Sequence, residues 1–220
     1  MSTLEVRPME VAALGAAAPN EAAAVVSTDW RRTLPMLAGR RVVLRELRLA
    51  DAPSLHAMLA AEEVARFISP PPSTVEGFER FIEWTLHRRA AGDCVCFGVV
   101  PEGWAHAVGI IQVRRLEPDF RTAEWGFALG QPFWGTGVFV DAAALVLEFA
   151  FETLGVERLE ARAAVANGRG NGALAKVGAT RECVLRRSFR RHGGYMDQVL
   201  WSILRSDWRR AKVVWSPRVH

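Results

Sequence analysis

Two glycines, Gly135 and Gly137, lie between an expected strand and an expected helix, a position that suits the binding of an anion. Glycine has no Cβ atom, so the backbone there can turn tightly and approach a ligand closely. The helix that follows begins with unpaired N–H groups and a partial positive charge, and both favour a phosphate. The sequence therefore predicts a phosphate-binding loop at residues 135–137, with an ordinary strand-to-helix turn as the alternative.

Two common nucleotide-binding loops do not match this segment. A P-loop requires a Gly-Lys-Ser/Thr sequence after its first glycine, and no lysine occurs here. A dinucleotide-binding loop requires a third glycine or an alanine three residues after Gly137, where this chain has Val140. What remains is a two-glycine loop of a kind that could hold a pyrophosphate.

The glycine loop follows a segment, residues 122–129, that is typical of a strand. Its side chains alternate between an apolar face and a second face. The apolar face carries Ala123, Trp125, Phe127 and Leu129, and the second face carries Glu124, Gly126 and Ala128.

A long helix is expected from the loop to about Leu154. Its acidic residues Asp141, Glu148 and Glu152 share one face, and nearly all of its other residues are apolar, which predicts a mostly buried helix. Residues 156–165 form the next expected strand, so this strand–helix–strand unit should be a right-handed parallel crossover.

The remaining elements follow from capping residues, apolar spacing and turn signals. Asp51 is expected to cap the first helix, with Pro53 in its first turn. Further strands are expected at 41–47, 94–100 and 107–113, further helices at 75–91 and 170–177, and a closing hairpin at 182–191 and 195–204. The order β-α-α-β-β-β-α-β-α-β-β predicts a mixed α/β (α+β) fold.

Three segments of unequal character make up the chain. Residues 1–28 are rich in alanine and interrupted by Gly15 and Pro19, which predicts an arm outside the main fold. Residues 29–212 are expected to form a single domain, and residues 213–220 a C-terminal tail.

Composition excludes several classes of protein. Of the 220 residues 50% are hydrophobic and 24% are charged, which is too apolar for a disordered chain. No apolar run reaches the ~18 residues of a membrane span, which predicts a soluble protein. Three cysteines are too few for a disulfide scaffold and fit a reducing cytoplasm. The net charge of +4 permits an anionic partner, but no concentrated basic face indicates nucleic acid.

Several motifs, taken in order, resemble those of the GNAT acyl-CoA N-acyltransferases, and within them the RimJ/RimL-like branch. The similarity covers roughly Trp30 to Trp208. The segments that carry it are Gly39–Arg45, Ala123–Phe127, Trp134–Ala142, the set Asn167, Leu174, Lys176 and Gly178, and the hairpin Gly193–Asp197.

The resemblance implies a GNAT-like fold, with a central twisted mixed sheet, a splayed parallel strand pair and helices on both faces. Acetyl-CoA, or another acyl-CoA, would lie between the splayed strands as co-substrate. The residues that the resemblance assigns to it are the backbone of Phe127, Ala128 and Leu129 at the pantetheine and thioester, Trp134, Gly135, Thr136, Gly137, Val138, Phe139 and Val140 at the pyrophosphate loop, and the side chains of Asn167 and Asn171.

The resemblance also implies a base, and the candidate is Glu124, which would lie beside the thioester and act directly or through water. A strand carboxylate paired with an arginine is the alternative. Glu182 is a second candidate. The family's serine and tyrosine acids are replaced by Gly170 and Leu174, so either solvent protonates the CoA thiolate or this member has lost activity.

Three residues are candidates for the acceptor side: Trp84 on a helix expected to cover the pocket, and Tyr195 and Asp197 in the hairpin. The expected function is transfer of an acetyl group to a primary amine, either a protein N-terminus or a small amine. The alternative is an acyl-CoA-binding module without turnover. No metal is expected, because Cys94 and Cys96 lack neighbouring ligands and suit a core, and the chain is expected to be a monomer or a homodimer.

Overall fold

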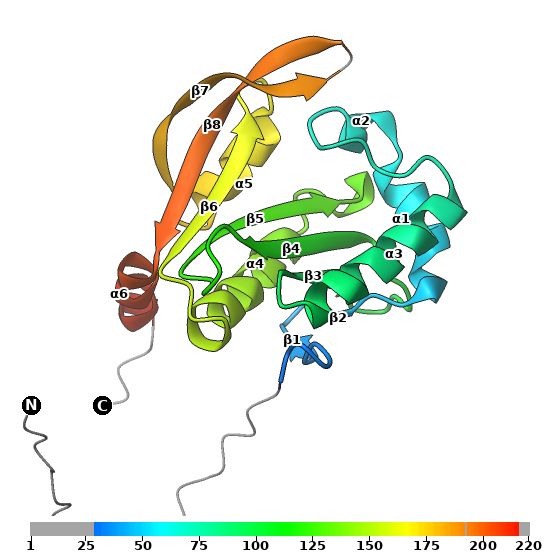
Figure 1. Cartoon of the computed structure of the whole chain (residues 1–220), viewed down its shortest axis with the longest axis horizontal. Helices are drawn as coiled ribbons and strands as arrows, with labels where there is room; N and C mark the ends of the chain where they lie inside the picture. The colour runs from blue at the N-terminus through cyan, green and yellow to red at the C-terminus, as the bar shows by residue number, and fades with distance from the viewer. Residues whose placement is uncertain (1–28, 192, 216–220) are drawn as a thin grey trace, which may run out of the picture.

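An eight-stranded mixed sheet forms the centre of the protein (Figure 1). The computed structural model describes residues 29–191 and 193–215, with side chains only to Ala211, so the expected N-terminal arm lies outside the described residues. The strands lie in the order β1-β2-β3-β4-β5-β6-β8-β7. Their bounds are β1 Leu37–Ala38, β2 Val42–Glu46, β3 Cys94–Pro101, β4 Gly109–Arg115, β5 Thr122–Leu129, β6 Arg158–Ala164, β7 Thr180–Arg191 and β8 Gly194–Leu204.

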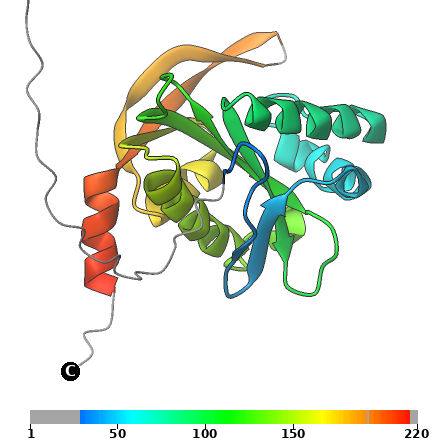
Figure 2. The ribbon, with the colours of Figure 1, turned by 60° about the horizontal axis from the view of Figure 1, so that its bottom comes forward.

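Helices cover both faces of this sheet, as predicted (Figure 2). One face packs against α4, and the other packs against α1 and α3. Their bounds are α1 Ala52–Leu59, α2 Glu62–Ala65, α3 Val75–Ala90, α4 Val138–Glu148, α5 Gly168–Lys176 and α6 Arg205–Trp215. No helix within the described ranges is both long and apolar enough to span a bilayer.

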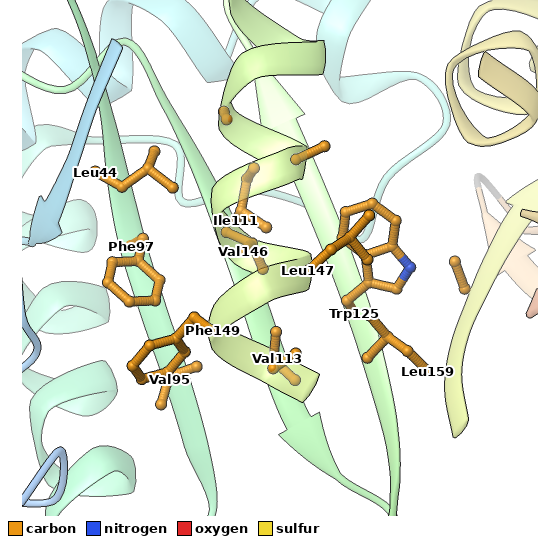
Figure 3. Close-up of a cluster of buried hydrophobic side chains, with 14 of the residues drawn as sticks. Leu44, Val95, Phe97, Ile111, Val113, Trp125, Val146, Leu147, Phe149 and Leu159 are labelled. Atoms are coloured by element: carbon orange, nitrogen blue, oxygen red, sulfur yellow. The ribbon is translucent and has the colours of Figure 1, made fainter. Parts of the chain in front are cut away.

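The larger of two hydrophobic cores lies between α4 and the sheet (Figure 3). Val146 and Leu147 of α4 face the central strands, where Ile111 and Trp125 are buried. Because nearly every strand contributes a side chain to it, this core fixes α4, and with it the loop at the start of α4, relative to β5 and β6.

The sequence predicted most of these elements with small errors. The predicted strand 122–129 has the observed bounds of β5, and the helix expected to reach Leu154 is instead an α-helix to Glu148 followed by a π-helical turn at Phe149–Thr153. The amide of Leu154 donates to the carbonyl of Phe149 in that turn, at 3.1 Å. Neither β1 nor α6 was predicted, and α6 continues past residue 212, where a tail was expected to begin.

Asp51 has a different role from the helix cap that its position predicted. Its side chain makes no capping hydrogen bond to α1. Instead it is fully buried and accepts two hydrogen bonds from Arg45 of β2, both at 2.8 Å. It also accepts from the amides of Arg48 at 2.8 Å and Ala107 at 3.0 Å. The carboxylate therefore joins the start of α1 to β2 and to the loop before β4.

Candidate functional site

The parallel strands β5 and β6 separate soon after they begin. They pair only at Thr122, Ala123 and Glu124, opposite residues 158–160 of β6. Beyond this point β5 remains paired with β4 as far as Leu129, whereas β6 remains paired with β8 as far as Ala164. Figure 1 shows β6 and the β7–β8 hairpin turning away from β5. The backbone of residues 126–129 therefore faces a gap in the sheet.

The two-glycine loop lies at the open end of β5, immediately before α4. Gly135 and Gly137 both have positive φ angles, 76° and 90°, which residues with a Cβ atom rarely adopt. Among the described residues, no acceptor receives a hydrogen bond from the amides of Phe139 and Val140 in the first turn of α4. A Cβ atom added at Gly135 would meet nothing within 4 Å. The loop is thus an open cradle of free N–H groups, which fits a pyrophosphate.

Two residues outside the loop hold it in place. The guanidinium of Arg41 donates to the carbonyl of Thr136 at 3.3 Å, and the amide of Arg41 donates to the carboxylate of Asp141 at 2.7 Å. Gly39 packs so closely against Asp141 that a Cβ atom there would lie 2.5 Å from Oδ2. The turn before β2 therefore fits against the start of α4, and this contact was not predicted from the sequence.

A ring contact joins the two sides of the gap near the loop. The indole N–H of Trp134 donates to the carbonyl of Leu129 at 2.8 Å. The guanidinium of Arg169, at the start of α5, lies 4.3 Å from the centre of the Trp134 ring. Trp134 thus closes off the end of β5 and connects it to the helix that follows β6.

A cavity of about 490 Å³ opens between the splayed strands and the segment that joins α2 to α3. Expected site residues that line it are Glu124, Phe127, Ala128 and Asn167. Gly126 also lines it, and a Cβ atom at that position would meet nothing within 4 Å. The cavity therefore continues from the cofactor side of the gap towards the α1–α3 face of the sheet.

Glu124 lies in this cavity between two arginines. Its Oε2 accepts a hydrogen bond from Arg114 of β4, and its Oε1 accepts one from Arg162 of β6 at 3.2 Å. The Glu124 side chain is 16% exposed. The ion pairs continue along the sheet from Arg162 to Glu160 at 3.7 Å and from Glu160 to Arg158 at 2.8 Å.

Comparison with known proteins identifies the family. The acetyltransferase (GNAT) domain matches residues 41–180, which is more than half of the chain. This chain belongs to the GNAT acetyltransferase family. The resemblance inferred from its motifs is therefore confirmed at the level of the family.

Relatives of this GNAT protein cover most of its length. YoaA of Bacillus subtilis (strain 168), an uncharacterized N-acetyltransferase, is 26% identical over 176 residues, which are 78% of this chain and 97% of YoaA. A solved T. thermophilus protein assigned to the acetyltransferases is 32% identical, with a TM-score of 0.69 over 84% of this chain and 97% of that one. Mycobacterium smegmatis RimJ in complex with CoA-disulfide has the same fold, with 20% identity and a TM-score of 0.72 over 81% of this chain and 93% of RimJ. A GNAT domain implies binding of an acyl-CoA, and the open glycine loop fits one.

Asn167 and Asn171 both have structural roles in this GNAT domain. The side-chain oxygen of Asn167 caps α5 by accepting from the amide of Gly170 at 2.9 Å, while the residue also lines the cavity. The amide group of Asn171 donates to the carbonyls of Ala164 and Asn167, and its oxygen accepts from Trp201. An amide group has two N–H donors, so both donors of Asn171 are used within the protein, and its expected part in binding the cofactor stays a prediction.

Neither Gly170 nor Leu174 offers a hydroxyl in place of the missing acid, and among the described residues that line the cavity only Ser69, in the segment between α2 and α3, carries one. A Cβ atom at Gly170 would lie 2.5 Å from the side-chain nitrogen of Asn167, so a serine there would require Asn167 to move. Leu174 lines the cavity with an apolar side chain and is buried.

Glu182, the second candidate base, lies outside the cavity lining on the exposed strand β7. It accepts hydrogen bonds from Ser202 at 2.5 Å and from Arg158 at 3.0 Å. The hydrogen bond from Ser202, with the smaller effect of Arg158, lowers the pKa of Glu182 below its usual value. Of the two candidate bases only Glu124 lines the cavity, and the role of either residue as a base stays a prediction.

The three residues expected on the acceptor side do not line the cavity. Trp84 is exposed and stacks on Phe81, which does line it. Tyr195 is exposed near the tip of the hairpin. Asp197 accepts from the amide of Arg187 at 2.7 Å and so stabilises a bulge of β7 at which Arg187 has a φ of 51°. Their roles towards an acceptor stay predictions.

Two groups of cavity residues were not among the predicted site residues. One is the wall at residues 67–72, which joins α2 to α3 and includes Phe67 and three prolines. The other is the pair Arg114 and Arg162, which flank Glu124 from neighbouring strands. Alternation along each strand could have placed both arginines on the face of Glu124, but only the strand order and register bring them together.

Cys94 and Cys96 are buried in β3, as expected for core residues. Burial raises the pKa of Cys94 to about 11, and it also raises the pKa of Cys96. Among residues 29–191 and 193–215, no three His, Cys, Asp or Glu residues lie close enough together to hold a metal.

Proposed function

We propose that this protein transfers the acetyl group of acetyl-CoA to a primary amine, either a protein N-terminus or a small amine. The observation that carries the proposal is the early separation of β5 and β6 beside an open loop of free amides. That arrangement leaves backbone groups of residues 126–129 available along the gap, and it gives a pyrophosphate a place at its end.

The reaction needs an unprotonated amine next to the thioester carbonyl. The amine nitrogen forms a bond to the carbonyl carbon, the carbon–sulfur bond breaks, and CoA leaves as a thiolate. One proton must leave the amine, and one must reach the sulfur. Since the cavity residues include no hydroxyl acid at positions 170 and 174, solvent supplies the second proton.

Glu124 takes the first proton in this proposal. Each of its carboxylate oxygens accepts one hydrogen bond from an arginine, but a carboxylate has about four acceptor positions. A water molecule can therefore bind to Glu124 as well, and it would carry the proton from the amine. The two arginines fix the carboxylate in the cavity.

Calorimetry with acetyl-CoA, followed by a thiol-release assay over a panel of amines, tests the proposal. We expect saturable binding of acetyl-CoA and release of CoA with at least one amine. Absence of acetyl-CoA binding would overturn both the cofactor site and the activity.

A single variant tests the base. We expect Glu124→Gln to lower kcat at least about tenfold, because general bases contribute roughly 10²- to 10⁴-fold, and to leave the Kd of acetyl-CoA nearly unchanged. Glu160→Gln is the matched control, because Glu160 lies opposite Glu124 on the neighbouring strand β6 but does not line the cavity. Equal kcat values in the Glu124→Gln variant and the unaltered protein would show that Glu124 is not the base.

A second candidate function is acyl-CoA binding without turnover. The observation that favours it is the apolar side chain of Leu174 and the fully engaged Asn171, which leave the thiolate without a protein acid. The same experiment separates the two functions, because acetyl-CoA binding with no CoA release on any amine would support the second.

A further inference from the structure

The cavity beside Glu124 has one apolar wall and one charged end. The apolar side chains belong to α1, the segment after α2, α3 and β4, and they include Leu59, Phe67, Ile68, Pro70, Pro71, Pro72, Phe78, Phe81 and Ile110. The charged side chains that line the cavity are Arg114, Arg162 and Glu124. An acceptor that fills this space must therefore offer an apolar body and a charged group.

Two arginines and one carboxylate line the charged end, although the ion pairs that continue from Arg162 to Glu160 balance the charge outside the cavity. Both oxygens of Glu124 already accept from the two arginines, so its charge is compensated. Arg162 also lies 3.7 Å from Glu160, whereas Arg114 has no acceptor other than Glu124 among the described residues. The side chains of Arg114 and Arg162 are 54% and 34% exposed and both line the cavity, so a ligand in the cavity can reach them.

This arrangement suits an anion more than a polycation. A guanidinium has five N–H donors in a planar fork, and it binds carboxylates with two parallel hydrogen bonds. A polyamine would need carboxylates that are not already paired, and the lining offers none. A carboxylate one carbon away from the amine would place the amine close to Glu124, because Glu124 lies between the arginines.

We propose that the acceptor is a free α-amino acid with an apolar side chain. Its carboxylate binds Arg114 and Arg162, its amine faces Glu124, and its side chain packs against the wall formed by Phe67 and Phe81. This inference rests on the proposed acetyl transfer and narrows its acceptor. The transfer is the one given above, with a new amide bond to the α-nitrogen, loss of the carbon–sulfur bond, and the amine proton passing to Glu124.

A series of related amines tests this assignment by CoA release from acetyl-CoA. The series is phenylalanine, phenylalaninamide, phenethylamine and spermidine. We expect kcat/KM for phenylalanine to exceed that for each of the others at least about tenfold, as charged hydrogen bonds predict. The amine of phenylalaninamide is less basic than that of phenylalanine, so a larger fraction of it is unprotonated at neutral pH. Amine protonation alone would therefore make phenylalaninamide the better substrate of these two.

A variant shows whether Arg114 recognises the carboxylate. Arg114→Gln should reduce the preference for phenylalanine over phenethylamine to within about threefold by raising KM for phenylalanine, because a charged hydrogen bond is lost. A merely structural effect on Glu124 would lower both rates and leave their ratio unchanged. Arg121→Gln is the control, because Arg121 is exposed in the β4–β5 loop, outside the cavity, and should keep the full preference.

The outcomes separate this inference from the proposed function. Equal or faster turnover of phenylalaninamide, phenethylamine or spermidine overturns the amino-acid assignment while acetyl transfer stands. An unchanged preference in Arg114→Gln also overturns it. Failure of the proposed function has a different signature, namely no binding of acetyl-CoA in the calorimeter, or binding with no release of CoA on any amine of the series.

Discussion

The buried carboxylate of Asp51 gives the sharpest test of the architecture around the cavity, and Asp51→Asn is the variant to make. Oδ1 accepts from Arg45 at 2.8 Å and from the amide of Ala107 at 3.0 Å. Oδ2 accepts from Arg45 at 2.8 Å and from the amide of Arg48 at 2.8 Å. Asparagine keeps the size of the side chain, but it replaces one of these acceptors with a donor.

Neither orientation of the asparagine amide can satisfy the site. In each, the NH₂ group faces one guanidinium N–H and one backbone N–H. Two hydrogen bonds are lost, and the two N–H bonds of the asparagine point at two N–H bonds of the protein. The charge of Arg45, which is 8% exposed, also loses its partner. Breaking a buried charged pair in this way costs about 3–5 kcal/mol of unfolding free energy, which for a chain of this size lowers Tm by roughly 6–20 °C.

Urea and thermal unfolding followed by circular dichroism measure the effect. Asp119→Asn is the control, because Asp119 pairs with Arg121 at 3.5 Å with side chains 60% and 67% exposed, and such surface pairs contribute less than about 1 kcal/mol. A loss below about 1 kcal/mol in Asp51→Asn, within the range of a surface pair, would refute the view that this network holds α1 on the sheet.

Three further predictions concern pH, the acceptor space and the loop. Burial alone would raise the pKa of Asp51, but hydrogen bonds from Arg45, Ala107 and Arg48 outweigh burial and lower it. The stability that Asp51 contributes is therefore present above the unfolded pKa of about 3.9 and is lost as pH falls through the folded pKa. Between about pH 5 and pH 2 the urea midpoint should thus fall less in Asp51→Asn than in the unaltered protein. Gly126→Val should leave Tm unchanged or raised and reduce kcat/KM for the acceptor at least about tenfold, because the added methyl groups enter the cavity; unchanged turnover would place the acceptor elsewhere. Gly135→Val should abolish acetyl-CoA binding in calorimetry. Gly155→Val is the control, because Gly155 has a φ of 75° and Gly135 a φ of 76°, so both variants should carry a similar backbone strain of about 1–2 kcal/mol while Gly155→Val still binds. Equal binding by both variants would contradict the loop assignment.

Local patterns in the sequence were sufficient for elements whose signal lies within a few residues. The alternation over residues 122–129 predicted β5, and the acidic stripe with an otherwise apolar surface predicted a buried α4. The same patterns did not predict where the backbone departs from a regular helix or strand. The π-helical turn at Phe149–Thr153 carries the same apolar residues as a helix would.

Elements stabilised by contacts distant in sequence were missed. The strand β1 has only two residues and exists because it pairs with β2. The helix α6 packs Trp208 against Phe151, whose rings lie 5.2 Å apart, although the two residues are far apart in the chain. Neither contact can be inferred from spacing along one segment.

Some residues of the candidate site could be predicted from local sequence patterns, and others depend on contacts distant in sequence. The glycine loop and Glu124 could be found from residue types and spacing, and the fold places both beside the gap between β5 and β6. The arginine partners of Glu124 depend on β4, β5 and β6 being neighbours in a particular register, with Arg114 directly opposite Glu124. Asp51 illustrates the reverse error, since its position before a helix suggested a cap while its burial favoured an ion pair.

The ring contact between Trp134 and Arg169 has a consequence for how a long ligand enters. The gap is joined at its base by backbone hydrogen bonds between β5 and β6, and near the loop the guanidinium of Arg169 stacks on the indole of Trp134. Such a contact at an exposed site is worth about 0.5–1 kcal/mol, so this contact by itself favours its formed state over its broken state by only about twofold to fivefold. Breaking this contact requires no strand to unfold, so a long ligand that enters from the side would displace a weak interaction rather than part of the sheet.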